Sequence, residues 1–231
     1  MKVKIHREGL NILAILLAIL LVINFPAWLF IRPLSIPIAF SVVSLVIFLL
    51  VLNFFRSPRR NYKGEEKDVV VASADGKVVA LEETYEPEYL KCRCIQLSVF
   101  MSVINVHANW FPVNGKVIYV RHHAGRFLSA FLPKSSTENE RSTVVIEAEN
   151  GQKILMRQVA GAIARRIVTY AREGEPSSIH NHMGFIKFGS RIDLYLPLDA
   201  EILVKLGDVT TGGMTPVAKL KGGNNNLDYG K

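Results

Sequence analysis

The chain has 231 residues, a net charge of +8 at pH 7 and two cysteines, and its length suits one substantial domain with an appendage. Cys92 and Cys94 cannot build a metal site alone, and no cluster of His, Cys, Asp or Glu has the spacing of a zinc site. The positive charge comes without a recognised nucleic-acid-binding motif. We therefore expect reduced structural thiols, no metal and no nucleic-acid partner.

Two charge-free apolar runs open the chain, over residues 10–31 and 34–55, with Arg32 and a proline between them. Each run is about 33 Å long as a helix, enough to cross a hydrocarbon core of about 30 Å. Neither has a polar face, which disfavours two buried core helices, and the second run directly after the first disfavours a signal peptide. Residues 1–55 are therefore predicted to form a membrane hairpin of two transmembrane helices.

Basic residues flank this hairpin on both outer sides. They are Lys2, Lys4 and Arg7 before the first run and Arg56, Arg59, Arg60 and Lys63 after the second. The positive-inside rule then places residues 56–231 on the cytoplasmic side of the cell inner membrane. Pro26 and Pro37 can shorten or kink the helices near the turn, so a hairpin that does not fully cross the membrane is the alternative. The basic character of residues 56–231 suits an anionic lipid surface.

The part of the chain after the hairpin consists mainly of short strand signals separated by turns. Asp75-Gly76, Asn114-Gly115 and Asn150-Gly151 are pairs that favour tight hairpins. Short strands at this spacing predict a mainly β domain, a barrel or a sandwich, attached to the α-helical hairpin. Residues 158–171 are compatible with a short helix as well as with strands, so an α+β description also fits.

The stretch GFIKFGSRIDLYLP, residues 184–197, alternates between apolar and polar positions as a half-buried strand does. Ser190 falls on the apolar face, directly after Gly189. A core serine with a hydrogen-bond partner beside a bulge glycine explains this pattern without any function. Alternatively, the serine is a nucleophile, and glycine gives close access to the backbone.

A nucleophilic serine needs a nearby base, and the base needs an orienting acid. His107 lies among apolar residues near a predicted corner, where a core histidine with a structural partner is the alternative. Asp75 is an ionisable residue in a turn phrase that otherwise needs no function. The candidate trio is therefore Ser190, His107 and Asp75, although chain order does not show that they meet.

Six phrases in this part of the chain, in this order, resemble the short form of the phosphatidylserine decarboxylase family, a group of pyruvoyl-dependent lipid enzymes. They are FFRSPRR (54–60), ASADGKV (72–78), SVINVHANWFPVNGKV (102–117), STENERSTVVIE (136–147), QVAGAIARRIV (158–168) and MGFIKFGSRIDLYLP (183–197). The resemblance covers residues 54–220.

This resemblance implies that the chain cuts itself between Gly189 and Ser190. The products would be residues 1–189 (the β chain) and 190–231 (the α chain), which stay associated. Ser190 would become a covalent pyruvoyl group, the Schiff-base site for the amine of phosphatidylserine, whose decarboxylation yields phosphatidylethanolamine. His107 would return a proton, and Asp75 would orient or charge-balance His107 during self-cleavage.

Two departures from the family pattern concern the site itself. The commoner cleavage motif is Gly-Ser-Thr or Gly-Ser-Ser, whereas this chain has Arg191 after Ser190; Gly-Ser-Arg belongs to the short bacterial branch, so the serine role is kept. Long members also have a second histidine three residues after the one matching His107, and here Trp110 stands there. Two alternatives follow: one histidine serves both self-cleavage and decarboxylation, or another group takes one of these roles.

Two alternative functions stay open from the sequence. The first is decarboxylation of a related serine phospholipid, since nothing in the chain reports the lipid backbone. The second is a non-catalytic membrane adaptor, because LVKLGDVTTGGMTPVAKL (203–220) resembles the closing hairpins of biotinyl and lipoyl domains. The sequence also leaves a homo-oligomer open.

Overall fold

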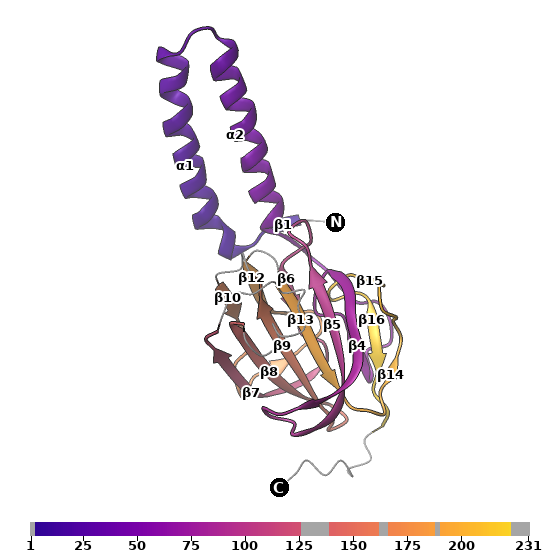
Figure 1. Cartoon of the computed structure of the whole chain (residues 1–231). Helices are drawn as coiled ribbons and strands as arrows, with labels where there is room; N and C mark the ends of the chain where they lie inside the picture. The colour runs from indigo at the N-terminus through magenta and orange to yellow at the C-terminus, as the bar shows by residue number, and fades with distance from the viewer. Residues whose placement is uncertain (1–2, 126–138, 162–165, 188–189, 223–231) are drawn as a thin grey trace. The chain divides into compact units, whose positions relative to one another are not determined.

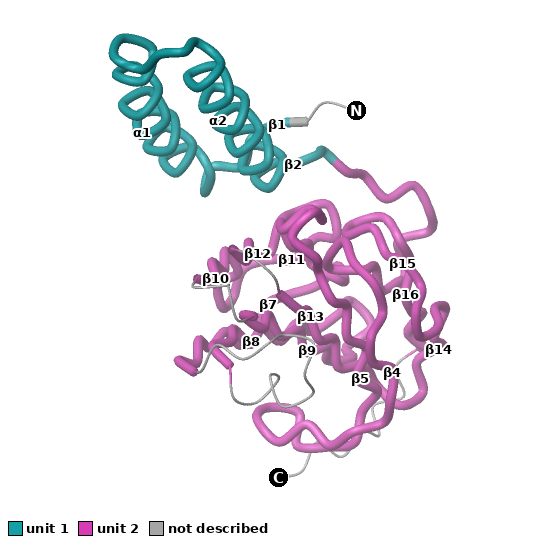
Figure 2. The backbone as a smooth tube through the Cα atoms, turned by 45° about the horizontal axis from the view of Figure 1, so that its top comes forward, with its two compact units in different colours: residues 1–59 teal, residues 60–231 magenta. Residues whose placement is uncertain are grey.

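The computed structural model describes residues 3–125, 139–161, 166–187 and 190–222. The chain divides into two compact units, Met1–Arg59 and Arg60–Lys231 (Figure 2). Sequence patterning put this boundary after residue 55. It falls later because β2 (Arg56–Pro58) pairs with β1 (Val3–Ile5) and so belongs to the first unit.

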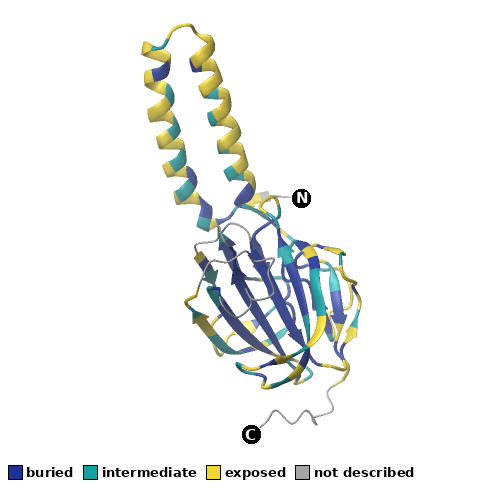
Figure 3. Cartoon of the chain, viewed as in Figure 1, coloured by how far each residue is buried: buried dark blue, intermediate teal, exposed yellow. Residues whose placement is uncertain are grey.

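The first unit is a pair of apolar helices, α1 (Arg7–Phe30) and α2 (Ser35–Phe54). Both are long and apolar enough to cross a membrane, and large apolar side chains are exposed all along them (Figure 3). Polar groups join the helices: Asn24 Nδ2 donates to Ser44 Oγ at 2.7 Å, and Trp28 Nε1 donates to Ser41 Oγ at 3.0 Å. Such bonds hold helices together where lipid offers no alternative partner. The unit therefore suggests membrane association.

The second unit is built almost entirely from strands, which confirms the mainly β fold class (Figure 1). Its strands are β3 (Val69–Val71), β4 (Gly76–Glu86), β5 (Cys92–Met101), β6 (Ala108–Trp110), β7 (Gly115–His123), β8 (Arg141–Ala148), β9 (Lys153–Ala160), β10 (Arg166–Thr169), β11 (Pro176–Ser177), β12 (His182–Lys187), β13 (Ser190–Leu196), β14 (Glu201–Ile202), β15 (Val209–Thr210) and β16 (Pro216–Lys219). Within residues 158–171, the described segments are the end of β9 and the whole of β10, and residues 162–165 lie outside the description.

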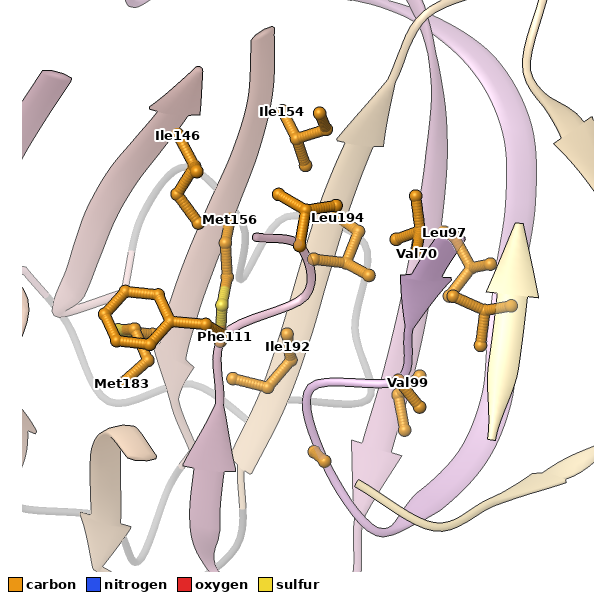
Figure 4. Close-up of a cluster of buried hydrophobic side chains, with 14 of the residues drawn as sticks. Val70, Leu97, Val99, Phe111, Ile146, Ile154, Met156, Met183, Ile192 and Leu194 are labelled. Atoms are coloured by element: carbon orange, nitrogen blue, oxygen red, sulfur yellow. The ribbon is translucent and has the colours of Figure 1, made fainter. Parts of the chain in front are cut away.

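An eight-stranded curved sheet in the order β11-β7-β8-β9-β13-β5-β4-β15 dominates this unit. Strand β13 lies near its centre, antiparallel to β9 on one side and to β5 on the other. Every described residue of β13 is buried (Figure 3). Ile192 and Leu194 pack with Met156 and Val99 in the main apolar core (Figure 4). Two three-stranded sheets, β10-β12-β6 and β14-β16-β3, complete the unit.

Two of the three predicted hairpins are wrong, and glycine geometry explains why. The turn at Asn150-Gly151 does join β8 to β9, but β3 and β4 belong to different sheets, as do β6 and β7. A Cβ on Gly76 would lie 2.1 Å from the Phe100 carbonyl oxygen, and one on Gly115 would lie 2.1 Å from the Glu147 carbonyl oxygen. These glycines therefore mark close approaches between strands rather than tight turns.

The two phrases around these glycines occupy matching places in the fold. Gly76 pairs with Thr210 on β15, and Gly115 pairs with Ser177 on β11. The hydroxyls of these partners donate to Ala74 O at 3.0 Å and to Val113 O at 3.1 Å, respectively. Both β4 and β7 also carry a register shift shortly after the glycine. The edges of the large sheet thus repeat one arrangement.

A buried charge network lies on the face of the sheet opposite the main apolar core. The Arg157 guanidinium donates to Glu86 at 2.8 Å, to Glu88 at 2.9 Å and to the Tyr195 hydroxyl at 2.9 Å. Burial raises the pKa of Glu88, but the hydrogen bond from His123 and the charge of Arg157 outweigh it, so the pKa lies below its ordinary value. Each charge in this network is paired, so we assign it a structural role.

We expect the thiol of Cys94 to resist alkylation in the native protein. Burial raises its pKa to about 12, and the neighbouring Cys92 and Glu86 add to this shift, so at pH 8 about one thiol in ten thousand is the reactive thiolate. Intact-mass measurement after iodoacetamide treatment should show Cys94 unmodified before denaturation and modified after it. Rapid native modification of Cys94 would contradict this description of the core.

Candidate active site

Ser190 is the first residue of β13 and is fully buried. Its backbone lies between Met101 of β5 and Ala160 of β9, and its hydroxyl donates to the Met101 sulfur at 3.2 Å. Alternation along the strand puts its side chain on the same face as Ile192 and Leu194, whose side chains enter the core (Figure 4). The predicted cleavage partner, Gly189, lies outside the described residues.

His107 is also fully buried, in the segment between β5 and β6. Its Nδ1 lies 3.0 Å from the carbonyl oxygen of Asn105. Because a carbonyl only accepts hydrogen bonds, Nδ1 carries the proton, and in the neutral ring Nε2 is the basic nitrogen. The imidazole is therefore held in one tautomer by its own loop.

The fold brings Ser190 and His107 to the same end of the sheets by two routes. Strand β5 ends at Met101, the partner of Ser190, and the chain reaches His107 six residues later. On the other side, the His107 carbonyl accepts from Ile186 N at 3.2 Å, and β12 ends one residue after Ile186. In chain order, the predicted cleavage bond falls between β12, which contacts the segment carrying His107, and β13, which pairs with the strand that leads into that segment.

Asp75 also lies at this end of the sheet, but its described partners are Arg60 and Gly212. Arg60 Nη1 pairs with Asp75 Oδ1, and Arg60 Nη2 donates to Oδ2 at 2.7 Å. Gly212 N donates to Oδ1 at 2.9 Å. The two side chains are only 6% and 14% exposed, so this is a largely buried, bidentate ion pair. That Asp75 orients or charge-balances His107 stays a prediction.

Trp110, at the position where long family members have a histidine, supports the Arg60 side chain. The guanidinium lies 4.5 Å from the centre of the indole ring, close enough for a cation–π contact. His182 meets the same indole edge-on, with ring centres 4.7 Å apart. A Cβ at Gly212 or Gly213 would come within 2.8 Å of the indole, so these glycines let the chain lie against it. We call Arg60, Asp75, Trp110 and Gly212 the Arg60 cluster.

The matching arrangement around Gly115, at the other edge of the large sheet, shows which part of this geometry is structural. There Asn114 occupies the place of Asp75, and its Oδ1 accepts from Ile179 N at 3.0 Å, as Asp75 Oδ1 accepts from Gly212 N. A neutral amide therefore satisfies the backbone contact equally well. The carboxylate of Asp75 adds only what its charge can do, namely the ion pair with Arg60.

Sequence reasoning missed three residues around the site. Arg60 looked like membrane-flanking charge, and only its contact with Asp75 shows otherwise. Asn105 stands inside one of the six family phrases but was given no role, and its carbonyl bonds His107. Arg191, noticed only as a departure, is buried, and its Nε pairs with Asp193 Oδ1 at 2.8 Å. Among the described residues, no cluster of three or more His, Cys, Asp or Glu could hold a metal ion.

Comparison with known sequences decides the family. The family described as phosphatidylserine decarboxylase matches residues 47–218. The chain belongs to this family. A phosphatidylserine decarboxylase proenzyme of Parabacteroides distasonis is 52% identical over 94% of this chain and 99% of its own length. The proenzyme of Bacteroides thetaiotaomicron is 53% identical over 95% of this chain and 96% of its own length. The resemblance seen in the six phrases is thus confirmed.

We predict that removing one partner of the Arg60–Asp75 pair destabilises the protein more than removing both. Arg60→Met or Asp75→Asn leaves one buried charge unpaired and should cost about 3 kcal/mol of unfolding free energy. The double variant should cost clearly less than the sum. Denaturant unfolding in a Ser190→Ala background, where the chain stays whole, measures each value.

The exposed Arg93–Glu83 pair, 68% and 57% exposed, is the matched control for this cycle. Glu83→Gln should cost less than about 1 kcal/mol. Additive effects of Arg60→Met and Asp75→Asn would mean that the two charges do not depend on one another.

Proposed function

We propose that this chain is the precursor of a pyruvoyl-dependent decarboxylase that converts phosphatidylserine to phosphatidylethanolamine in phospholipid biosynthesis. The observation that carries the proposal is the place of Ser190. It is a buried hydroxyl at the start of the central strand, next to the segment that holds His107 in a defined tautomer, in a chain of the phosphatidylserine decarboxylase family. Family membership favours this enzyme over a non-catalytic adaptor.

In the proposed self-cleavage, the Ser190 hydroxyl oxygen attacks the Gly189 carbonyl, and the Gly189–Ser190 amide becomes an ester. Loss of the α-proton of Ser190 then expels the Gly189 carboxylate and leaves a dehydroalanine. Water replaces its nitrogen, ammonia leaves, and a pyruvoyl group remains at position 190. Ser190 is a suitable source because burial shields its hydroxyl from bulk water. No metal is required by these steps.

His107 is the proposed base and acid of the site. Its Nε2 is the nitrogen able to accept the serine proton, because Nδ1–H is committed to the Asn105 carbonyl. In the mature enzyme, the pyruvoyl group would supply the electron sink for loss of carbon dioxide from the amine-bearing substrate. The protonated imidazole would then return a proton to the product carbon. Asp75 is proposed to balance charge at this end of the sheet through Arg60.

The two products of cleavage are proposed to stay associated. Strand β13, in the 190–231 fragment, pairs along its length with β5 and along most of it with β9. At the site, Arg60 Nη1 donates to the Gly212 carbonyl at 2.8 Å, and Thr210 Oγ1 donates to Ala74 O at 3.0 Å. Each of these bonds links the two fragments, so cutting one peptide bond leaves the packing in place.

The proposed location is the cytoplasmic side of the inner membrane. Support comes from the two apolar helices and from the basic residues that flank them on both outer sides. A lipid head group lies at the bilayer surface, so a tethered domain meets its substrate there. A related serine phospholipid remains the alternative substrate, because the proposed chemistry involves only the serine head group.

We expect active protein to consist of two chains. Denaturing mass spectrometry should show residues 1–189 and a small fragment whose N-terminus is blocked and reacts with carbonyl reagents. Ser190→Ala should give one inactive chain of 25.8 kDa, because no hydroxyl is present to attack Gly189. Full activity from an uncut wild-type chain would rule out the pyruvoyl mechanism.

We expect His107→Ala to separate cutting from turnover. Cutting occurs once per molecule, so a slow residual reaction can accumulate some processed protein during expression. Turnover needs the proton donor every cycle, and loss of a general acid costs about 10²–10⁴-fold in rate. Activity is normalised to pyruvoyl content. Asn105→Ala is the companion variant, because it keeps both the imidazole and the backbone carbonyl that bonds it. Near-normal turnover of processed His107→Ala would place the proton donor elsewhere.

A further inference from the structure

A tight turn with an unusual tip separates β5 from the His107 segment. Asn105 N donates to Ser102 O at 2.9 Å and closes the turn. The Asn105 side-chain oxygen accepts from Ser102 N at 2.9 Å and from Ser102 Oγ at 2.6 Å. The two residues at the tip are Val103 and Ile104, although β-branched apolar residues are uncommon at turn corners.

Both tip side chains are exposed despite being apolar. Val103 is 51% exposed and Ile104 is 69% exposed. Two adjacent large apolar residues at an exposed turn tip suit an apolar environment outside the domain. Because three hydrogen bonds fix the turn, the chain cannot easily fold these side chains back onto the core. We call Val103 and Ile104 the apolar tip.

The same asparagine connects the apolar tip to the candidate active site. The Asn105 side chain holds the turn, while its backbone carbonyl accepts the proton of His107 Nδ1 at 3.0 Å. Met101, directly before the turn, is the strand partner and hydrogen-bond acceptor of Ser190. A group that docks at the tip therefore lies within a few residues of both reacting side chains.

Basic residues accompany the tip at this end of the fold. Lys187 ends β12, one residue after the Ile186 amide that bonds His107 O. Arg166, which is exposed, is its strand partner on β10. Apolar tips flanked by basic side chains match the surface of an anionic bilayer.

We infer that the apolar tip inserts into the surface of an anionic phospholipid bilayer and so presents the site to lipid head groups. The bilayer is the one occupant that matches both an apolar pair and neighbouring cations. The inference rests on the proposed function, because it describes how a decarboxylase that takes a membrane lipid would reach it. It adds a second membrane contact, made by the catalytic unit itself, to the two helices.

The test measures immersion of the tip directly in the full-length chain. Ile104→Cys, in a Cys92→Ser and Cys94→Ala background, carries an environment-sensitive fluorophore and is reconstituted in vesicles of phosphatidylcholine and phosphatidylglycerol. Tyr85→Cys is the matched control, because Tyr85 is 58% exposed and lies at the end of β4 that is far from Gly76 and the candidate active site. Lipid-attached nitroxide should quench the label at 104 but not the label at 85.

Two results would overturn the inference. One is equal quenching of both labels by a water-soluble quencher in vesicles. The other is shielding of the 104 label in detergent that increases with protein concentration, which would identify a second copy of the chain as the occupant. Neither readout requires decarboxylation, so failure of the inference differs from failure of the proposed function, which is judged by the mass and pyruvoyl content of the same samples.

Kinetics supply a second readout that a purely structural turn would not produce. Val103→Ser with Ile104→Ser should cut normally, since both changes are confined to exposed side chains at the turn tip. Its kcat/KM for phosphatidylserine in bilayers should fall about tenfold, the factor expected when two side chains lose part of their apolar burial. Its kcat/KM for a short-chain, water-soluble phosphatidylserine should be unchanged. An equal loss on both substrates would also count against insertion.

Discussion

Strand β13 is the element on which the rest of the structure depends, because its first residue is both a core position and the proposed reactive group. The strand is antiparallel to β5 along its length and to β9 along most of it. All of its residues are buried, and Ile192 and Leu194 anchor it in the main core. Burial holds Ser190 in place before cutting. The same pairing retains the new chain end afterwards, since residues 191–195 keep their strand partners on β5 and β9 when the bond before Ser190 breaks. A pyruvoyl group formed there would therefore begin a strand that stays ordered.

The Arg60 cluster ties the two proposed fragments together at the site and gives Asp75 a defined partner. Arg60 binds the carboxylate of Asp75 and the carbonyl of Gly212, and Trp110 covers one face of the guanidinium. The repeat at the other edge of the sheet, with Asn114 in place of Asp75, separates backbone bonding from charge. We therefore assign this pair the role of fixing charge and position at the site. That leaves His107 as the proposed proton-transfer group of the site.

Much of this architecture could be predicted from the sequence, and particular residues show where prediction stopped. The apolar helices followed from charge-free runs, and β13 followed from the alternation around Ser190, because both depend on local periodicity. The turns at Asp75-Gly76 and Asn114-Gly115 were wrong because glycine there permits a close approach to Phe100 or Glu147, which are distant in sequence. Arg60 could not be assigned, since an arginine after an apolar helix looks the same whether it faces lipid or Asp75. The tautomer of His107 likewise depends on a carbonyl whose position only the fold fixes.

Hydrogen exchange along β13, before and after cutting, tests most directly whether this strand holds the proposed chain end in the core. The uncut Ser190→Ala precursor and the processed wild-type protein are compared in the same membrane mimic, peptide by peptide. If strand pairing retains the new end, amides of residues 191–196 exchange equally slowly in both forms, and the difference is confined to the residues beside the cut. Fast exchange of this strand in the processed protein, with the precursor still protected, would show that the pairing with β5 and β9 does not survive cleavage and would contradict the structure's central role for β13.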